Sequence, residues 1–284
     1  MPDLVDAYLA RLGGRSLAGV APSVGALGRL HRAHVEHVPY ETVDLVAGRP
    51  PGIEPRESAE RVVSGRGGYC YQLNGAFSWL LRELGYDVVR HVAGVSYSAD
   101  RTTGADGNHL GLTVRGLPDA QCPDGTWLVD VALGDALHEP MPLRWGQYAQ
   151  GPFTYRVVPS PTEPDGWRLK HAAGGSFAVV DFAAPAVELD AFAEKHRYLS
   201  SDPASPYVRV LTAQRRDADG VDILRGRVLT RWDASGTAAR ELDADEWWDA
   251  LAGRFELVLA RADREPLWRK VSVAHEAWRA ARRG

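Results

Sequence analysis

The 284-residue sequence is poor in cysteine, with only Cys70 and Cys122. Two cysteines in so long a chain do not make a disulfide framework, so we expect both to be reduced in a cytoplasmic protein. No run of about 18 apolar residues could cross a membrane, and the N-terminal segment lacks the apolar core of a signal peptide. The formal net charge is -4 and no basic stripe is present, which disfavours nucleic acid as a partner.

The pattern of apolar residues changes near residue 86. Before it, apolar residues recur at helical spacing, which predicts helices near residues 4–12, 23–37, 59–63 and 70–84. From residue 86 to 199, short apolar segments alternate with turn residues, and the strand candidates are 87–95, 109–115, 126–132, 153–158, 166–170 and 176–182. So many short strands in succession predict an antiparallel barrel or sandwich.

The last part of the chain mixes both kinds of element. It opens on a serine- and proline-rich connector over 200–206, followed by two predicted strands near 207–214 and 221–232. Helices are predicted near 243–254 and 266–281. We therefore expect an α+β protein of three parts: a helical region over 1–85, a β region over 86–199 and an α/β region over 200–284.

The most informative motif surrounds Cys70, in the run Arg-Gly-Gly-Tyr-Cys-Tyr-Gln-Leu-Asn over residues 66–74. Two glycines allow a tight turn, and helical spacing of apolar residues starts directly after the cysteine. Cys70 should thus lie in the first turn of a helix, where unpaired N–H groups and the helix dipole favour the thiolate. A lone cysteine is more often a small buried apolar residue, so this hypothesis needs partners for the thiol.

Two residues are candidate partners. His109 begins a predicted strand at the end of a polar loop, and Asp130 interrupts an otherwise apolar strand, where a buried carboxylate needs a partner. If the two strands form an antiparallel hairpin, Gly111 lies opposite Asp130, and His109 and Asp130 become diagonal neighbours on one face. Taken singly, each has a structural explanation: a histidine at the edge of the core, and an aspartate satisfied by backbone amides.

The other histidines carry less information. His31, His34 and His37 have helical spacing that amphipathic packing explains, and no reading is favoured for His138. A zinc site formed by Cys70, His109 and Asp130 lacks a further cysteine or histidine at ligand spacing. We therefore predict no metal.

These segments resemble the arylamine N-acetyltransferases. Residues 66–74 look like that family's nucleophile motif, and Asn108-His109 and Val129-Asp130-Val131 are similar to its other two catalytic segments. Residues 34–44, 200–210 and 225–231 also look like segments of the family, so the resemblance covers nearly the whole chain. The resemblance implies a helical bundle, a β-barrel and an α/β lid with a cysteine-protease-like core.

The resemblance also implies roles for residues. Cys70 becomes the nucleophile, His109 the base and Asp130 the residue that orients the base. Tyr40, Tyr97, Leu133 and Gly134 fall where the family lines its substrate pocket, and Glu41 and Arg66 fall where it has a structural ion pair. The family implies acetyl-CoA as co-substrate, no tightly bound cofactor, and an aromatic amine or hydrazine as acceptor.

Two departures from the family pattern stand out. Gln72 replaces a residue that is often acidic, and Ala132-Leu133-Gly134 replaces a usual Gly-Phe-Gly. Loss of the aromatic ring removes a stacking surface for an aryl substrate. An amide synthase of the same family, taking a long acyl chain from a carrier protein, is therefore an alternative. A cysteine hydrolase and a non-catalytic binding module are the others.

Overall fold

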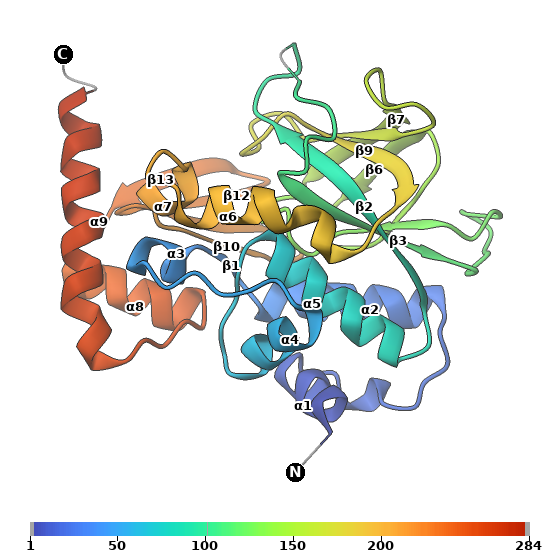
Figure 1. The fold of residues 1–284 in the computed structure, drawn as a ribbon, viewed down its shortest axis with the longest axis horizontal. Coiled ribbons are helices and arrows are strands. Elements are labelled where there is room, and N and C mark those ends of the chain that lie inside the picture. The colour runs from blue at the N-terminus through green and yellow to red at the C-terminus, as the bar shows by residue number, and fades with distance from the viewer. Residues whose placement is uncertain (1–2, 101, 282–284) are drawn as a thin grey trace.

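The computed structural model describes residues 3–100 and 102–281, and helices pack in it against two antiparallel sheets (Figure 1). The first part of the chain is helical, as predicted. It comprises α1 (Leu4–Arg11), α2 (Val24–His37), α3 (Val43–Ala47), α4 (Pro55–Val63) and α5 (Cys70–Glu83), with a 3₁₀ turn at Arg15–Leu17. The sequence patterns did not indicate the short helix α3.

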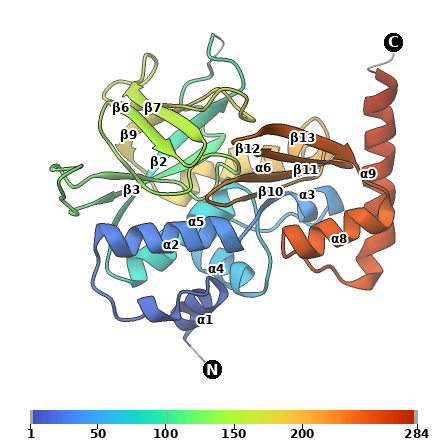
Figure 2. The ribbon, with the colours of Figure 1, turned by 180° about the vertical axis from the view of Figure 1, so that it is seen from behind.

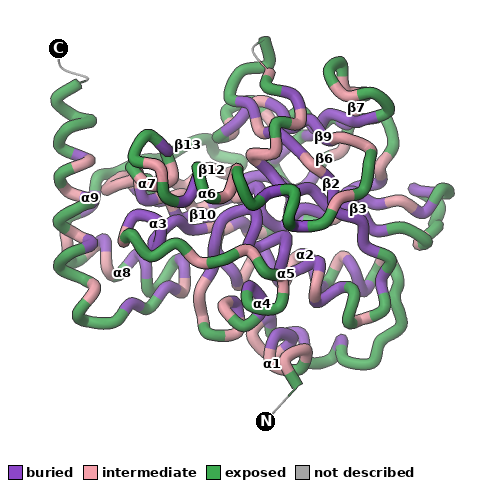
Figure 3. The backbone as a smooth tube through the Cα atoms, viewed as in Figure 1, coloured by how far each residue is buried: buried purple, intermediate pink, exposed green. Residues whose placement is uncertain are grey.

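Local signals in the sequence set where these helices begin. The hydroxyl of Ser23 accepts a hydrogen bond from the N–H of Ala26 and caps α2. Glu54 caps α4 in the same way through the N–H of Glu57, and Pro55 takes the first helical position, where its missing N–H costs nothing. Helix α5 is the central one, because almost all of its residues are buried between the other helices and the sheet (Figure 3).

The middle of the chain forms an eight-stranded antiparallel sheet, which confirms the predicted barrel. Its strand order is β5-β4-β3-β2-β9-β8-β7-β6. The strands are β2 (Asp87–Ser96), β3 (His109–Arg115), β4 (Trp127–Val129), β5 (Met141–Pro142), β6 (Gly146–Gln150), β7 (Phe153–Pro159), β8 (Trp167–Lys170) and β9 (Val179–Ala186). The short strands β5 and β6 were not predicted. Helix α2 runs below this sheet in the view of Figure 2.

The hairpin of β3 and β4 has the predicted register. Leu112 pairs with Val129 and Val114 with Trp127. Continuing the ladder by one residue places Gly111 opposite Asp130. The chain leaves the regular strand at Asp130, so β4 is shorter than the predicted 126–132.

The last part of the chain is an α/β lid, again as predicted. A second sheet has the order β1-β10-β11-β12-β13. Its strands are β1 (Tyr40–Glu41), β10 (Thr212–Arg216), β11 (Gly220–Arg225), β12 (Val228–Asp233) and β13 (Gly236–Glu241). The helices are α6 (Ala193–Ser201), α7 (Pro206–Arg209), α8 (Ala244–Arg254) and α9 (Arg261–Ala281), with a 3₁₀ turn at Leu189–Phe192.

Two strand predictions in this part were wrong in extent. The segment 207–214 begins as α7, because Pro206 follows the capping residue Ser205 and starts a helical turn. The segment 221–232 is two strands, separated at Gly226, which adopts a positive φ of 57° and turns the chain back. The predicted connector over 200–206 contains the end of α6 and the cap of α7.

One strand joins distant parts of the chain. Tyr40 of β1 pairs with Gln214 of β10 and also bridges to Gly68, in the loop before Cys70. The N–H of Glu41 donates to the carbonyl of Gly68 at 2.8 Å. The lid sheet is therefore continuous, through β1, with the loop that carries the cysteine.

Candidate active site

Cys70 is the first residue of α5, as the sequence predicts. The loop before it passes close to β1, since a Cβ added at Gly67 would lie 2.0 Å from the carbonyl oxygen of Pro39. Only glycine fits there. The thiol is 3% exposed, and its Sγ lies 3.6 Å from the carbonyl oxygen of Asn108, the residue before His109. Loop and strand thus bring the cysteine to the first residues of β3.

His109 and Asp130 form a buried pair. Nε2 of His109 lies 2.6 Å from Oδ2 of Asp130, and the two residues are 2% and 1% exposed. Oδ1 of Asp130 accepts hydrogen bonds from the side chain of Asn74 at 2.9 Å and from the N–H of Ala132 at 3.0 Å. These contacts fix the carboxylate, and Asn74 on α5 connects it to the helix that begins at Cys70.

The charge on His109 follows from this arrangement. Burial by itself lowers the pKa of an imidazole. Here Asp130, together with a smaller contribution from Cys70, outweighs burial and raises the pKa of His109 to about 10. Because Nε2 faces Asp130, Nδ1 is the nitrogen available to the thiol. At neutral pH the His109 ring is therefore an imidazolium. It lies beside Cys70, which is the first residue of a helix.

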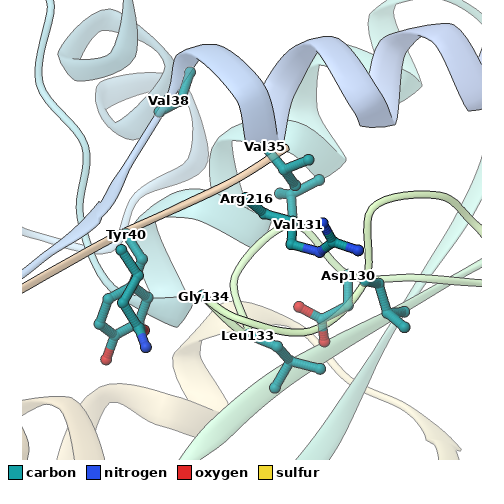
Figure 4. Close-up of a pocket in the computed structure, with 10 residues that line it drawn as sticks. Val35, Val38, Tyr40, Asp130, Val131, Leu133, Gly134 and Arg216 are labelled. Atoms are coloured by element: carbon teal, nitrogen blue, oxygen red, sulfur yellow. The ribbon is translucent and has the colours of Figure 1, made fainter. Parts of the chain in front are cut away.

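A cavity of about 540 Å³ opens onto these residues, with Cys70 and His109 in its wall. Three of the four predicted pocket residues, Tyr40, Tyr97 and Leu133, line it as well. Gly134 instead borders a separate cavity of about 10 Å³, which Tyr40 and Leu133 also line (Figure 4). Leu133 therefore lies between the two cavities and lines both of them.

The sequence did not single out several residues that line the large cavity. They come from the lid and from the loop before β9: Ser176, Phe177, Pro206, Tyr207, Thr212, Gln214 and Arg225. Burial raises the pKa of both Tyr40 and Tyr207 well above the usual value, and each phenol is close enough to the other to interact. No short-range pattern marks these positions, because the packing of the lid against the barrel brings them to the cavity.

A buried aspartate holds one wall of the cavity. Asp135, which is fully buried, accepts hydrogen bonds from the N–H and the hydroxyl of Ser176 at 2.6 and 2.8 Å. Nε2 of His171 lies 3.2 Å from the same carboxylate. Asp135 thus joins the loop after Asp130 to the Ser176-Phe177 segment.

The predicted ion pair near the loop before Cys70 involves an additional arginine. Oε1 of Glu41 lies 3.6 Å from Arg66 but 2.8 Å from Arg61. Arg61 also contacts Asp44 at 2.7 Å and donates to the carbonyl of Gly67 at 2.6 Å. Arg61 is therefore the residue that ties the loop to β1.

Gln72 points away from the His109–Asp130 pair. Its carbonyl oxygen accepts a hydrogen bond from the N–H of Tyr69, and its amide donates to the carbonyl of Gly52 at 2.9 Å. A neutral amide can donate and accept in this place, whereas a carboxylate can only accept. The departure at this position thus fits a local structural contact.

The histidines of α2 are part of the core near the site. His31 is fully buried, and its ring nitrogens bond to backbone groups of His138 and Asp130. Burial lowers the pKa of His31 to about 4, so it is neutral. In residues 3–100 and 102–281, no group of three or more His, Cys, Asp or Glu side chains could hold a metal ion. The helices of the same residues include none long and apolar enough to cross a membrane.

Helices, a barrel-like sheet and an α/β lid surround the cavity that Cys70 and His109 line, and residues 23–264 match the model of the family described as N-acetyltransferase. The chain belongs to the arylamine N-acetyltransferase family. It is 31% identical over 266 residues to the arylamine N-acetyltransferase of Mycobacterium tuberculosis, covering 90% of both chains. The structure of the Mycobacterium marinum arylamine N-acetyltransferase in complex with CoA has a TM-score of 0.81 at 28% identity, covering 94% of this chain and 99% of that one. Proansamycin X synthase of Amycolatopsis mediterranei is 30% identical over 164 residues, which are 56% of this chain and 59% of that protein.

Proposed function

We propose that this acetyltransferase works through Cys70, with acetyl-CoA as donor and an aromatic amine or hydrazine as acceptor. The observation that carries the proposal is the single line of side chains from Asp130 through His109 to Cys70, at the wall of a cavity of about 540 Å³. The imidazolium of His109 favours the thiolate of Cys70. The first N–H groups of α5 have no partner inside the helix and lie beside that sulfur.

In the first half of the reaction, the thiolate attacks the carbonyl carbon of the thioester. The N–H groups at the start of α5 stabilise the developing oxyanion. The C–S bond to CoA breaks, CoA leaves as its thiol after taking a proton from His109, and the acetyl group remains on Cys70. Asp130 keeps the imidazole ring oriented throughout.

In the second half, a neutral amine attacks the acetyl carbon and passes its proton to His109. The N–C bond forms, the C–S bond to Cys70 breaks, and the starting ion pair returns. Aromatic amines are weakly basic and therefore uncharged at neutral pH, so they need little activation. Both cysteines are free thiols, which suits the proposed cytoplasmic location.

Intact-mass spectrometry tests the proposal. After exposure to acetyl-CoA, the wild-type protein should gain one acetyl group, and added 4-aminobenzoate or hydralazine should remove it as the acetylated amine. Cys70→Ala should gain none, whereas Cys122→Ala, which changes the other buried thiol, should be labelled like wild type. A loss of the acetyl group at a rate that added amine does not change would instead indicate a hydrolase.

A second candidate is an amide synthase that accepts a larger acyl group from a thioester, including one held on a carrier protein. The similarity to Proansamycin X synthase and the leucine at position 133 favour it. The catalytic residues would be the same, so the donor decides. Faster labelling of Cys70 by a bulky aromatic acyl thioester than by acetyl-CoA would support the synthase.

A further inference from the structure

Part of the cavity wall is polar and comes from one face of the lid sheet, and Pro206 and Tyr207 of α7 lie beside it in the lining. Thr212 and Gln214 alternate along β10, Arg225 of β11 pairs with Thr212, and Tyr40 of β1 pairs with Gln214. All four side chains line the large cavity. The other face of the same strands carries Ala213 and Leu224, which belong to the apolar cluster with α8.

Arg225 differs from three other arginines of the lid. Arg215, Arg227 and Arg231 each have a carboxylate oxygen within 3.2 Å. Arg225 is exposed to the cavity mouth and has no ion pair among the residues that the structure describes. Its guanidinium group is therefore free to bind a ligand.

Gln214 lies deeper on the same wall. It is 7% exposed, and its side-chain amide makes no hydrogen bond among the described residues. The amide packs on the backbone of Gly134, where an added Cβ would lie 1.9 Å from Oε1 of Gln214. An amide held in place, facing a cavity and without a protein partner, is a ready hydrogen-bond donor for a ligand.

The cavity lining carries no carboxylate. His109 and Arg225 are its cationic side chains, and no aspartate or glutamate is among the described residues that line it. In the proposed mechanism His109 is paired with the thiolate of Cys70, so Arg225 is the cation left for a ligand. Asp130 is hidden behind His109. Adjacent strands lie about 5 Å apart, so β11 is about 10 Å across the sheet from β1 and the Cys70 side of the cavity. A ligand that reaches both Cys70 and Arg225 would have its charge at the end remote from the reacting atom.

We propose that Arg225 and Gln214 form a subsite for an oxyanion at the remote end of a substrate whose reactive end lies at Cys70. The inference rests on the proposed function and extends it to the chemistry of the substrate. A carboxylate on the amine acceptor and a phosphate on the thioester donor share this chemistry. A charge-assisted, bidentate contact from arginine fits both.

The test separates the two sources by using pairs of substrates that differ in charge. In a two-step transfer, kcat/KM for the donor reports acylation of Cys70 and kcat/KM for the acceptor reports its deacylation. The acceptor pair is 4-aminobenzoate and its methyl ester. The donor pair is acetyl-CoA and S-acetyl-N-acetylcysteamine, which lacks phosphates. The quantity measured is the ratio of kcat/KM for the anionic member to that for the neutral member.

Arg225→Gln should lower one of these ratios about 10- to 100-fold, as expected for the loss of a charge-assisted contact. Arg225→Lys should recover part of the ratio, and Gln214→Leu should lower the same ratio. A fall for the acceptor pair assigns the anion to the acceptor, and a fall for the donor pair assigns it to the donor. Arg209→Gln is the matched control, because Arg209 is an exposed arginine of the lid outside this cavity.

Ratios unchanged in Arg225→Gln, or changed equally in Arg209→Gln, would overturn the subsite. The proposed function has a separate readout, the labelling of wild-type Cys70 by either donor. The proposed function stands if thioesters label the wild-type protein and it transfers the acetyl group to both amines. The subsite is refuted if Arg225→Gln then leaves the ratios unchanged. A protein that no thioester labels loses the function itself.

Discussion

Nε2 of His109 lies 2.6 Å from Oδ2 of Asp130, and the second oxygen of the same carboxylate is held by Asn74 of α5. The proposed base, the residue proposed to orient it and the helix that begins at the proposed nucleophile are thus connected by two hydrogen bonds. A change at Asp130 should therefore affect the thiol two groups away.

Asp130→Asn should lower kcat/KM for acetyl transfer about 100- to 10,000-fold, because the imidazole loses the charge that keeps it protonated and oriented. The rate of Cys70 alkylation by iodoacetamide at pH 7 should fall with it. Asp124→Asn, in an exposed turn of the same hairpin, should leave both rates at the wild-type level. Unchanged alkylation in Asp130→Asn would contradict the proposed ion pair.

The protonation state of His109 should change at a pH well above the range in which an ordinary histidine titrates. Its pKa in the folded protein is raised to about 10 from 6.5. A raised pKa means that the stabilisation from the imidazolium is fully present below pH 6.5, persists at neutral pH and is lost as the pH rises through about 10. The ¹⁵N NMR signals of the His109 ring should titrate near pH 10. Titration near pH 6.5 would show that the interaction with Asp130 does not outweigh the effect of burial on the pKa of His109.

Arg61→Met should destabilise the protein by about 3–5 kcal/mol, because Glu41 is 1% exposed and would lose its shorter ion pair. Urea unfolding measures this change. Arg56→Met, which removes an exposed pair with Glu60, should cost less than about 1 kcal/mol. Equal effects of the two substitutions would mean that Arg66 alone is sufficient to balance the buried charge of Glu41.

Gly67→Ala should displace the loop before Cys70, since the added methyl group meets the carbonyl oxygen of Pro39. The expected results are a lower melting temperature and slower labelling of Cys70 by thioesters. Gly253→Ala is the control: it lies in α8 with nothing within 4 Å of the added Cβ, and should be neutral or stabilise by about 0.5–1 kcal/mol. A Gly67→Ala protein with wild-type labelling would show that β1 moves aside at little cost.

Leu133→Phe should favour the small acetyl group over bulky acyl groups in the labelling of Cys70. A phenyl ring adds a stacking surface and takes volume from the cavity that Leu133 lines. The ratio of labelling rates for acetyl-CoA and a bulky aromatic acyl thioester should therefore rise. Leu133→Met, which conserves volume, should leave that ratio near its wild-type value.

The sequence predicted those features that short-range patterns encode. The strand candidates 109–115 and 126–132, joined as a hairpin around residues 116–125, predicted the register that the structure has, and that register places His109 and Asp130 on one face. The apolar spacing after Cys70 predicted α5. In each case the partners are close in sequence or lie on one regular element.

Features that depend on packing between distant segments were not predictable. Arg225 and Gln214 reach the cavity only because the lid sheet docks beside the barrel, more than 100 residues beyond Cys70 in the chain. The strand β1 has two residues and no alternation to detect. Arg61 was missed because its contacts with Gly67 and Glu41 follow from the fold of the loop.

The short strand at Tyr40–Glu41 has a consequence for the order in which the protein is made. Its neighbours are Gly68 on one side and Thr212–Arg216 on the other, so the loop that presents the cysteine gains its last supporting strand pair only after residue 216 has been synthesised. A nascent chain that ends before β10 leaves one edge of β1 without its partner strand. The sulfur of Cys70 should therefore reach its final setting late in translation, when three quarters of the chain has left the ribosome.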